Sequence, residues 1–294
     1  FGLPHCPSRS KFTSSHVRIT LQATMESSFF DLEGKIAAIS GGAQGLGRSM
    51  ALGLASAGAD IVLADINPEA AAKTAQEIEE LGRRAIPVEC DVSKPEQIDV
   101  WFKQIDENFG RIDFLGNVAG AGILKTPEDL TLEEVNSVLN QLVTCRFYCC
   151  QQAGRRMLAT GKGSIVNIGS LASITALGRG HISYSMGMGA VVQMTRELST
   201  EWSNRGVHVN AILPAQVLNP GLQERIDKVP DLAETYLGGI PTGRFGHPDD
   251  IRGLAVFLAS DSASWITGAL IPMDGGNLAM NAGGSYPGGP RKSG

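Results

Sequence analysis

The stretch between Gly34 and Asn67 constrains the fold more than any other part of the sequence. A short apolar run, rich in β-branched residues, is followed at once by the glycine-rich segment 40–47. Small and apolar residues then recur at helical spacing until Gly58, and residues 60–65 form a second apolar run. The pattern predicts a buried strand, a tight glycine turn, a helix and a second buried strand.

The glycines of this turn have a use beyond bending the chain. A backbone without Cβ turns sharply and lies close to a pyrophosphate, which the free amides and positive dipole end of the next helix then hold. Asp65 ends the second strand, eighteen residues beyond Gly47. A carboxylate there bonds the adenosine ribose and repels a 2'-phosphate. The stretch therefore predicts a dinucleotide site, with NAD rather than NADP as the cofactor.

Strand and helix patterns alternate along the rest of the chain. Further strands are expected at 85–89, 112–115, 164–168, 207–213 and 269–272. Capping boxes, Ser93 with Glu96 and Thr131 with Glu134, mark two helix starts. This order predicts an α/β fold: a single-domain Rossmann-type, doubly wound parallel sheet of about seven strands, with helices on both faces and ligands at the carboxyl ends of the strands.

The predicted domain occupies residues 31–280, with a substrate-covering insertion at about 214–246 that has no single clear period. Residues 1–30 are interpreted as a leader or N-terminal extension. Their first 24 residues are basic, serine-bearing and free of acid, a composition typical of an organelle transit segment and also of a translated leader. The Gly- and Pro-rich residues 281–294 predict a flexible tail.

Bulk properties narrow the class of protein. The formal charge of −5 argues against a nucleic-acid or anionic-membrane surface. No apolar run approaches the roughly 18 residues that a membrane span needs. The five cysteines lack Cys-x-x-Cys spacing, which favours small buried side chains in a reducing compartment and no metal site. We expect a cytoplasmic protein, or an organellar one if the first 24 residues are a transit segment.

Five motifs at the predicted strand ends resemble those of the short-chain dehydrogenase/reductase family, in the family's order and over about residues 31–280. They are the turn Ser40–Gly47, Asp91-Val92, residues 117–120, Ser170 and Tyr184. The resemblance implies that Ser170 holds a substrate oxygen while Tyr184 donates or accepts its proton. It also implies cofactor contacts from Ser40, Gly41, Gln44, Gly45, Leu46, Gly47, Asp65, Ile66, Asp91, Val92, Asn117, Ala119, Gly120, Ile168, Tyr184, Pro214 and Val217.

Two catalytic positions depart from the family pattern. The family has a lysine four residues after the tyrosine, where this chain has Met188, and an asparagine where this chain has Leu142. The phenol of a free tyrosine has a pKa of about 10. A lysine about 5 Å away, at an effective dielectric of about 20, favours the tyrosinate form by roughly 3 kcal/mol. Since that lysine also bonds the nicotinamide ribose, its loss is expected to weaken cofactor binding by about 1 to 3 kcal/mol.

Three interpretations remain open. In the first, catalysis persists, because protonated Tyr184 is the acid that carbonyl reduction needs, with Arg179 or His181 as another source of charge or a proton path. In the second, the protein binds NAD(H) without turnover, or serves as a scaffold subunit. In the third, Met188 was introduced by engineering.

The substrate is predicted from the loops near the expected pocket. Arg179, His181 and Gln216 indicate something polar, such as a sugar, a polyol or a sugar acid, converted between secondary alcohol and ketone. The two long predicted helices, at about 131–160 and 182–204, carry more apolar residues than one sheet face requires. Together with the resemblance, this predicts a homodimer or homotetramer.

Overall fold

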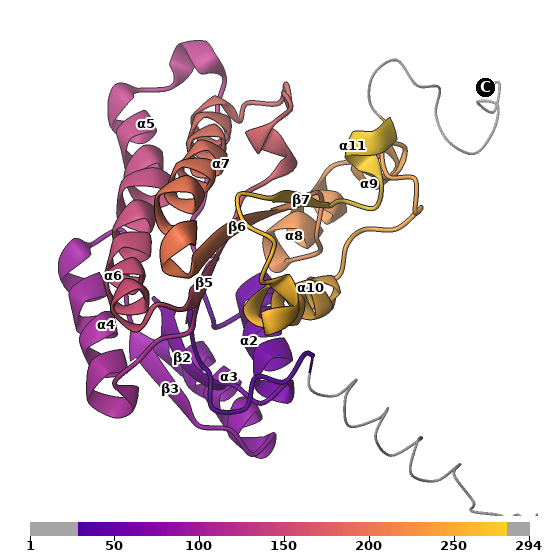
Figure 1. The fold of residues 1–294 in the computed structure, drawn as a ribbon. Helices are drawn as coiled ribbons and strands as arrows, with labels where there is room; N and C mark the ends of the chain where they lie inside the picture. Colours follow the sequence, from indigo (N-terminus) through magenta and orange to yellow (C-terminus); the bar gives the residue numbers. More distant parts are fainter. Residues whose placement is uncertain (1–28, 281–294) are drawn as a thin grey trace, which may run out of the picture.

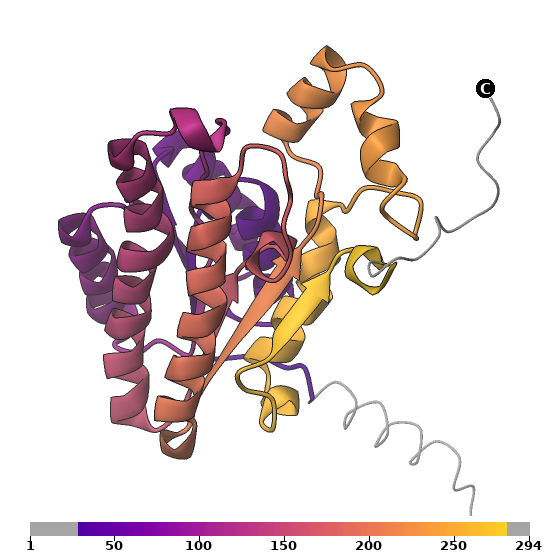
Figure 2. The same cartoon turned by 90° about the horizontal axis from the view of Figure 1, so that it is seen from above.

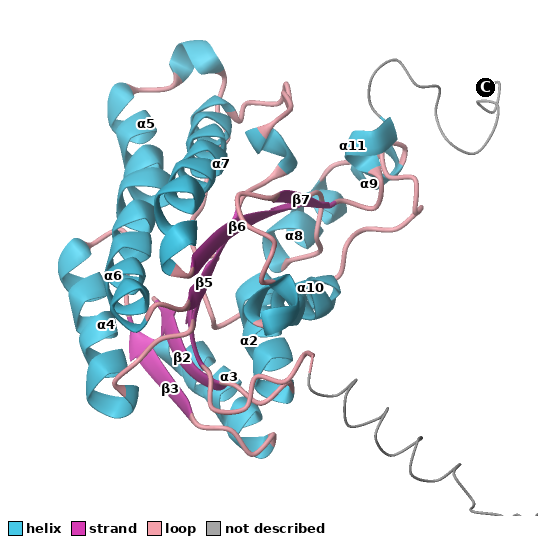
Figure 3. Cartoon of the chain, viewed as in Figure 1, coloured by secondary structure: helices cyan, strands magenta, loops and turns pink. Residues whose placement is uncertain are grey.

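The computed structural model describes residues 29–280 and consists of one seven-stranded sheet between two layers of helices (Figure 3). All adjacent strands run parallel, in the order β3-β2-β1-β4-β5-β6-β7. The strands are β1 Ile36–Ser40, β2 Asp60–Asp65, β3 Ala85–Glu89, β4 Phe114–Asn117, β5 Gly163–Ile168, β6 Val207–Pro214 and β7 Leu270–Met273. The predicted fold class is confirmed. The strand order reverses between β1 and β4, where such sheets form ligand crevices.

Helices cover both faces of the sheet (Figure 1). One layer contains α2 Gly45–Ser56, α3 Pro68–Glu80 and α10 Arg252–Ala259. The opposite layer contains α4 Pro95–Phe109, α5 Leu132–Leu139, α6 Cys145–Thr160 and α7 Ile182–Trp202. The remaining helices, α8 Pro220–Lys228, α9 Leu232–Leu237 and α11 Asn277–Met280, lie beyond the carboxyl ends of β6 and β7.

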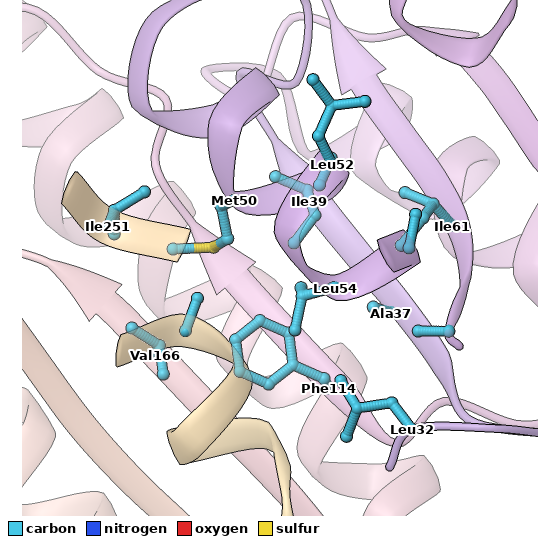
Figure 4. Close-up of a cluster of buried hydrophobic side chains, with 14 of the residues drawn as sticks. Leu32, Ala37, Ile39, Met50, Leu52, Leu54, Ile61, Phe114, Val166 and Ile251 are labelled. Atoms are coloured by element: carbon cyan, nitrogen blue, oxygen red, sulfur yellow. The ribbon is translucent and has the colours of Figure 1, made fainter. Parts of the chain in front are cut away.

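The strand β1 illustrates how the sequence divides the core between the two faces. Ala37 and Ile39 belong to the apolar cluster beneath α2 and α10, whereas Ile36 and Ala38 belong to the cluster beneath α4 and α6. Successive side chains of a strand point to opposite faces, so a fully apolar run is required when both faces are covered. Figure 4 shows the first cluster, in which Met50 of α2 packs beside Ile39 and near Phe114 of β4.

Three predicted local features differ from the structure. Strand β4 begins at Phe114, two residues later than predicted. The predicted capping box of Ser93 with Glu96 is wrong, because the N-cap residue of α4 is Lys94, which makes no side-chain cap. The Ser93 amide instead donates to the Asp91 carboxylate at 2.9 Å. The long helix predicted at 131–160 contains a π-helical turn, Asn140–Thr144, between α5 and α6. By contrast, the capping box of Thr131 is confirmed.

The predicted insertion at 214–246 consists of α8, α9 and their connecting loops, which stand away from the main body when the molecule is seen from above (Figure 2). Asn219 caps α8 by accepting a hydrogen bond from the Leu222 amide at 2.9 Å. Nearly all of the predicted leader lies outside the described residues, and so does the whole of the predicted tail.

Only some of the apolar residues on the two long helices are exposed to solvent. Leu142, Cys150 and Val191 are buried within this chain, whereas Phe147 is 41% exposed. Homo-oligomerisation therefore stays a prediction. No helix within residues 29–280 combines the length and apolarity needed to cross a bilayer.

Candidate active site

The glycine turn between β1 and α2 is closely packed. A Cβ on Gly47 would lie 2.0 Å from the Gly41 carbonyl oxygen, which leaves room for glycine alone. Gly41 and Gly45 have positive φ angles of 70° and 55°, a region that side-chain-bearing residues rarely adopt. The turn therefore exposes backbone amides at the N-terminus of α2, as binding of a pyrophosphate requires.

Two polar side chains hold the turn in place. The Ser40 hydroxyl accepts hydrogen bonds from the amides of Val118 and Ala119 at 3.0 and 3.2 Å, which joins the ends of β1 and β4. The Asp65 carboxylate accepts from the Ala43 amide at 2.9 Å through one oxygen and from the Asn67 amide at 3.0 Å through the other. Each carboxylate oxygen keeps a further lone pair for a ligand hydroxyl.

A cavity of about 360 Å³ opens beside this turn, at the switch point of the sheet. Of the residues predicted to contact the cofactor, it brings together Gly41, Gln44, Asp65, Ile66, Asp91, Val92, Ala119 and Gly120. A hydrogen bond from Ser93, followed by the charge of Lys94, holds the pKa of Asp91 below its usual value. The glycine cradle, the cavity and the Asp65 carboxylate fit the adenosine and pyrophosphate of a dinucleotide.

Other predicted cofactor residues lie outside the lining of this cavity. The Asn117 amide donates to Asn167 Oδ1 at 3.0 Å within the core. Val217 is buried and pairs with Gly246. Sequence reasoning missed Gln141, which lines the cavity and accepts from the Ala121 amide at 3.2 Å.

Ser170 and Tyr184 are positioned by two neighbouring elements at the carboxyl end of the sheet. Ser170 follows β5 and caps a short 3-10 helix, its hydroxyl accepting from the Ala172 amide at 3.2 Å, so that the hydroxyl proton is free to donate. That short helix packs against α7, whose first turn carries Tyr184. The tyrosine ring lies against Gly122 and at 5.7 Å, between ring centroids, from His181.

The two catalytic positions that the sequence predicts to depart from the family pattern lie together. Leu142, in the π-helical turn, and Met188, on α7, are 1% and 2% exposed and belong to one apolar cluster, against which Tyr184 packs. A Cβ on Gly187 would lie 3.1 Å from Leu142 Cδ1, so the π turn and α7 are in close contact here. Leu142 and Met188 thus form a packed apolar unit beside the tyrosine.

A second cavity, of about 540 Å³, lies beside Ser170 beneath α8 and α9. It brings Ser170 together with Arg179, Pro214 and Gln216, all predicted site residues. Gln216 Oε1 and Arg179 Nε are buried, and no residue among 29–280 gives either atom a hydrogen-bond partner. His181 lines a neighbouring cavity, which also includes Arg179.

Sequence reasoning missed two residues of this second cavity, Arg225 and Tyr236. Arg225 Nη2 donates to Tyr236 Oη at 3.1 Å, and the Arg179 guanidinium lies over the Tyr236 ring at 4.7 Å from its centroid. Burial, followed by the charges of Arg179 and Arg225, lowers the pKa of His181. The sequence signals a role for Arg225 and Tyr236 only through their place in the predicted substrate-covering insertion. Because the insertion has no single clear period, its sequence did not show which of its residues face the cavity.

Four features define the class of protein: the parallel sheet, the glycine cradle at its switch point, the acid that ends β2, and the serine and tyrosine beyond β5. They are those of the dinucleotide-binding oxidoreductases of Rossmann type. A sequence model of a family described as enoyl-(acyl carrier protein) reductase matches residues 41–277. The chain belongs to the short-chain dehydrogenase/reductase family, which confirms the resemblance.

Several curated relatives are named for dehydrogenation of a polyol or a sugar acid. The chain is 38% identical over 247 residues to the D-threitol dehydrogenase of Mycolicibacterium smegmatis, covering 84% of this chain and 94% of that one. It is 37% identical over 254 residues to the 2-dehydro-3-deoxy-D-gluconate 5-dehydrogenase of Pseudoalteromonas atlantica, covering 84% and 97%. The crystal structure of a short-chain type dehydrogenase/reductase from Mycobacterium marinum superposes with a TM-score of 0.80 at 31% identity, covering 85% and 98%.

Proposed function

We propose that this protein is an NAD-dependent oxidoreductase that interconverts a secondary alcohol and a ketone on a sugar acid. The observation that carries the proposal is the cavity beside Ser170, in which two arginines gather without an acid among the lining residues. The relatives named for threitol and for 2-dehydro-3-deoxy-D-gluconate support a polyol or sugar-acid substrate, and the arginines favour the sugar acid.

The proposed mechanism uses two side chains at the substrate oxygen. Bound NAD would supply the hydride acceptor, and NADH the donor. In alcohol oxidation, the Tyr184 oxygen takes the proton of the substrate hydroxyl; in reduction, it returns a proton to the carbonyl oxygen. Ser170 donates a hydrogen bond to that same oxygen and fixes its position. Asp65, Gln44 and the amides of the glycine turn would hold the dinucleotide.

The charges in the substrate-side cavity support an anionic substrate. Arg179 and Arg225 approach Tyr236 from its ring face and its hydroxyl, so both cations lie near one side chain. Like charges held together in a partly desolvated site repel each other, and a carboxylate relieves that repulsion while accepting charge-assisted hydrogen bonds. A neutral polyol does neither.

Exchanging both arginines for glutamine is expected to reverse the preference for charged substrates. In Arg179→Gln with Arg225→Gln, kcat/KM for keto sugar acids should fall by about 100-fold, since charge-assisted hydrogen bonds contribute about 1.5 to 3 kcal/mol each. The value for neutral ketoses should change by less than about threefold. Steady-state kinetics on paired acids and neutral sugars measures both. An equal loss on the two substrate types would contradict the sugar-acid assignment.

The choice of NAD rests on Asp65. In Asp65→Asn, the preference for NAD over NADP is expected to fall by about 30-fold or more, because removal of one charge near a 2'-phosphate relieves about 2 kcal/mol of repulsion. Asparagine keeps an oxygen that accepts from the Ala43 amide, so the turn should persist. Fluorescence titration with NADH and NADPH measures the preference, with Glu69→Gln on the exposed start of α3 as the control. An unchanged ratio in Asp65→Asn would show that the carboxylate does not face the ribose.

A second function has an observation in its favour. Met188 on α7 and Leu142 in the π-helical turn stand where the resemblance implies a lysine and an asparagine, which favours a protein that binds NAD(H) without turnover, or a scaffold subunit. Single-turnover oxidation of bound NADH, with a panel of keto sugars and keto sugar acids, separates the two functions. Turnover in the wild type supports the enzyme, whereas turnover only in Met188→Lys with Leu142→Asn supports the binder. Absence of NADH binding in both proteins would contradict both functions.

Assembly and compartment belong to the same proposal. We expect a homodimer or homotetramer formed through exposed apolar residues of the long helices, such as Phe147. A cytoplasmic location remains our expectation.

A further inference from the structure

The loop between β4 and α5 carries a glycine that faces the tyrosine of the proposed reaction. A Cβ on Gly122 would lie 2.8 Å from both Cβ and Cδ2 of Tyr184 and 3.0 Å from its Cγ. Carbon atoms in van der Waals contact lie about 3.5 to 4.0 Å apart, so no side chain fits between the loop and the ring. The φ angle of Gly122 lies outside the positive range that favours glycine. The contact with Tyr184, rather than the backbone conformation, therefore calls for glycine here.

A side chain at position 122 could not be accommodated by rotation of the ring. Tyr184 Cβ is bonded directly to the backbone of α7, so a change of χ1 moves the ring atoms and leaves Cβ in place. The helix itself is fixed to the sheet, because Asn167 Nδ2 of β5 donates to Thr195 Oγ1 at 3.0 Å and both residues are fully buried. An added side chain would therefore have to displace the loop or the first turn of α7.

The loop is held in place on both sides of Gly122. On one side the Ala121 amide donates to Gln141 Oε1 at 3.2 Å. On the other side Ile123 packs against the buried apolar cluster that contains Met188, as Tyr184 also does. Because both of its neighbours are anchored, Gly122 has little freedom to move away from the ring.

The same loop is joined further along to the segment that precedes α7. The Lys125 amide donates to the Gly180 carbonyl oxygen at 3.0 Å, and Lys125 Nζ lies 2.9 Å from both carboxylate oxygens of Glu134 in α5. The helix α5 packs beside α7 (Figure 1). Residues 118–121 line the cavity beside the glycine turn, and Lys125 lines a cavity that also includes Arg179. The loop thus runs from the cofactor side to the substrate side and contacts the tyrosine in between.

We propose that Gly122 is a positioning residue, which holds the ring of Tyr184 against the anchored loop and so keeps the tyrosine hydroxyl directed at the substrate oxygen. The proposal rests on the proposed function, in which Tyr184 exchanges a proton with that oxygen. Proton transfer requires the two oxygens to approach within about 2.6 to 3.2 Å. Because the ring packs against both the apolar cluster and the loop, a displacement of the loop reaches the hydroxyl.

Gly122→Ala is expected to lower kcat by about tenfold or more, since a misplacement of about 1 Å at a reacting group costs about 100-fold. The KM for the substrate and the affinity for NADH should stay within about threefold, because other residues line the two cavities. Steady-state kinetics and fluorescence titration measure these quantities. Gly189→Ala adds the same methyl group where the described residues around α7 leave space, and this control should keep kcat within about twofold.

A double-mutant cycle shows whether Gly122 acts through the tyrosine hydroxyl. In the Tyr184→Phe background there is no hydroxyl to misplace, so the further change Gly122→Ala should alter the residual kcat by less than about twofold. An equal loss in both backgrounds would overturn the proposal, because Gly122 would then affect turnover by a route that does not involve the hydroxyl.

The position of the ring can also be measured by nuclear magnetic resonance, without substrate or cofactor. The chain has four tyrosines, and in protein with isotope-labelled tyrosine rings the signal that disappears in Tyr184→Phe belongs to Tyr184. In Gly122→Ala this signal should move by more than its line width, whereas in Gly189→Ala it should stay in place. An unmoved signal in folded Gly122→Ala would overturn the proposal. A moved signal in a protein without turnover would uphold the role of Gly122 and contradict the proposed function instead.

A second variant covers the case in which Gly122→Ala does not fold. Ile123→Ala keeps the glycine and removes the side chain that anchors the loop to the apolar cluster. The Tyr184 signal should again move by more than its line width. Met194→Ala, which shortens another side chain packed against the same cluster, is the control and should leave the signal in place. An unmoved signal in folded Ile123→Ala would show that the ring keeps its position without the loop, and would overturn the proposal.

Discussion

Replacement of Tyr184 by phenylalanine is expected to lower kcat by about 1,000-fold in both directions, because general acid–base catalysis contributes about 10² to 10⁴. The exchange removes only the hydroxyl. The ring keeps its contacts with Gly122 and His181, so the folded state and the dinucleotide affinity should be preserved. Steady-state kinetics measures the loss, and fluorescence titration with NADH measures the affinity.

Tyr148→Phe is the matched control for this variant. Tyr148 Oη donates to the Asp99 carboxylate at 2.6 Å on the outer side of α6, away from both cavities. The control should keep its turnover within about twofold, since exposed hydrogen bonds contribute little. Full activity in Tyr184→Phe would remove the tyrosine from the proposed chemistry.

The second large effect is expected at Gly47. In Gly47→Ala, the new methyl group meets the Gly41 carbonyl, so the turn has to open. We expect the free energy of unfolding to fall by about 2 to 3 kcal/mol, as for other overpacked sites. Dinucleotide affinity should fall by about 100-fold or more, since the amides at the start of α2 lose their arrangement. Urea unfolding and NADH titration measure the two quantities.

Gly189→Ala makes the same chemical change where there is space. Apart from the adjoining backbone of α7 itself, the described part of the chain brings no atom within 4 Å of a Cβ at this position, and alanine is the better helix former by about 0.8 to 1 kcal/mol. This variant should therefore be slightly more stable than the wild type, with unchanged affinity for NADH. Equal behaviour of the two variants would contradict the interpretation of the turn as a cradle that only glycine permits.

The fold was largely predictable because its signals are local. Apolar runs of strand length, glycines at helix ends and caps such as Asn67, which accepts from the Ala70 amide at 3.0 Å, each depend on a few neighbouring residues. The errors have physical causes. Strand β4 was predicted too early because Ile112 is buried like a strand residue although it precedes the ladder. The π turn at Asn140–Thr144 keeps a helical hydrophobic pattern, so periodicity alone does not reveal it.

The candidate site was predictable where it follows strand ends. Asp65, Ala119 and Ser170 each stand at or just after the end of a strand, and parallel strands deliver such positions to one edge. Arg225 could not be found in this way. It lies on α8, in the predicted insertion, and it lines the substrate-side cavity together with residues that are far from it in the sequence.

The two arginines of the substrate-side cavity arrive on separate parts of the chain. Arg179 belongs to the loop between β5 and α7, whereas Arg225 belongs to α8, in the insertion that stands away from the main body. The glycine cradle, by contrast, is formed by the turn between β1 and α2, which is separate from the insertion. Exchange of α8 and α9 alone between relatives would therefore change the substrate specificity and leave the cofactor-binding part of the fold unchanged. Such an exchange is a modular route by which specificity can diversify.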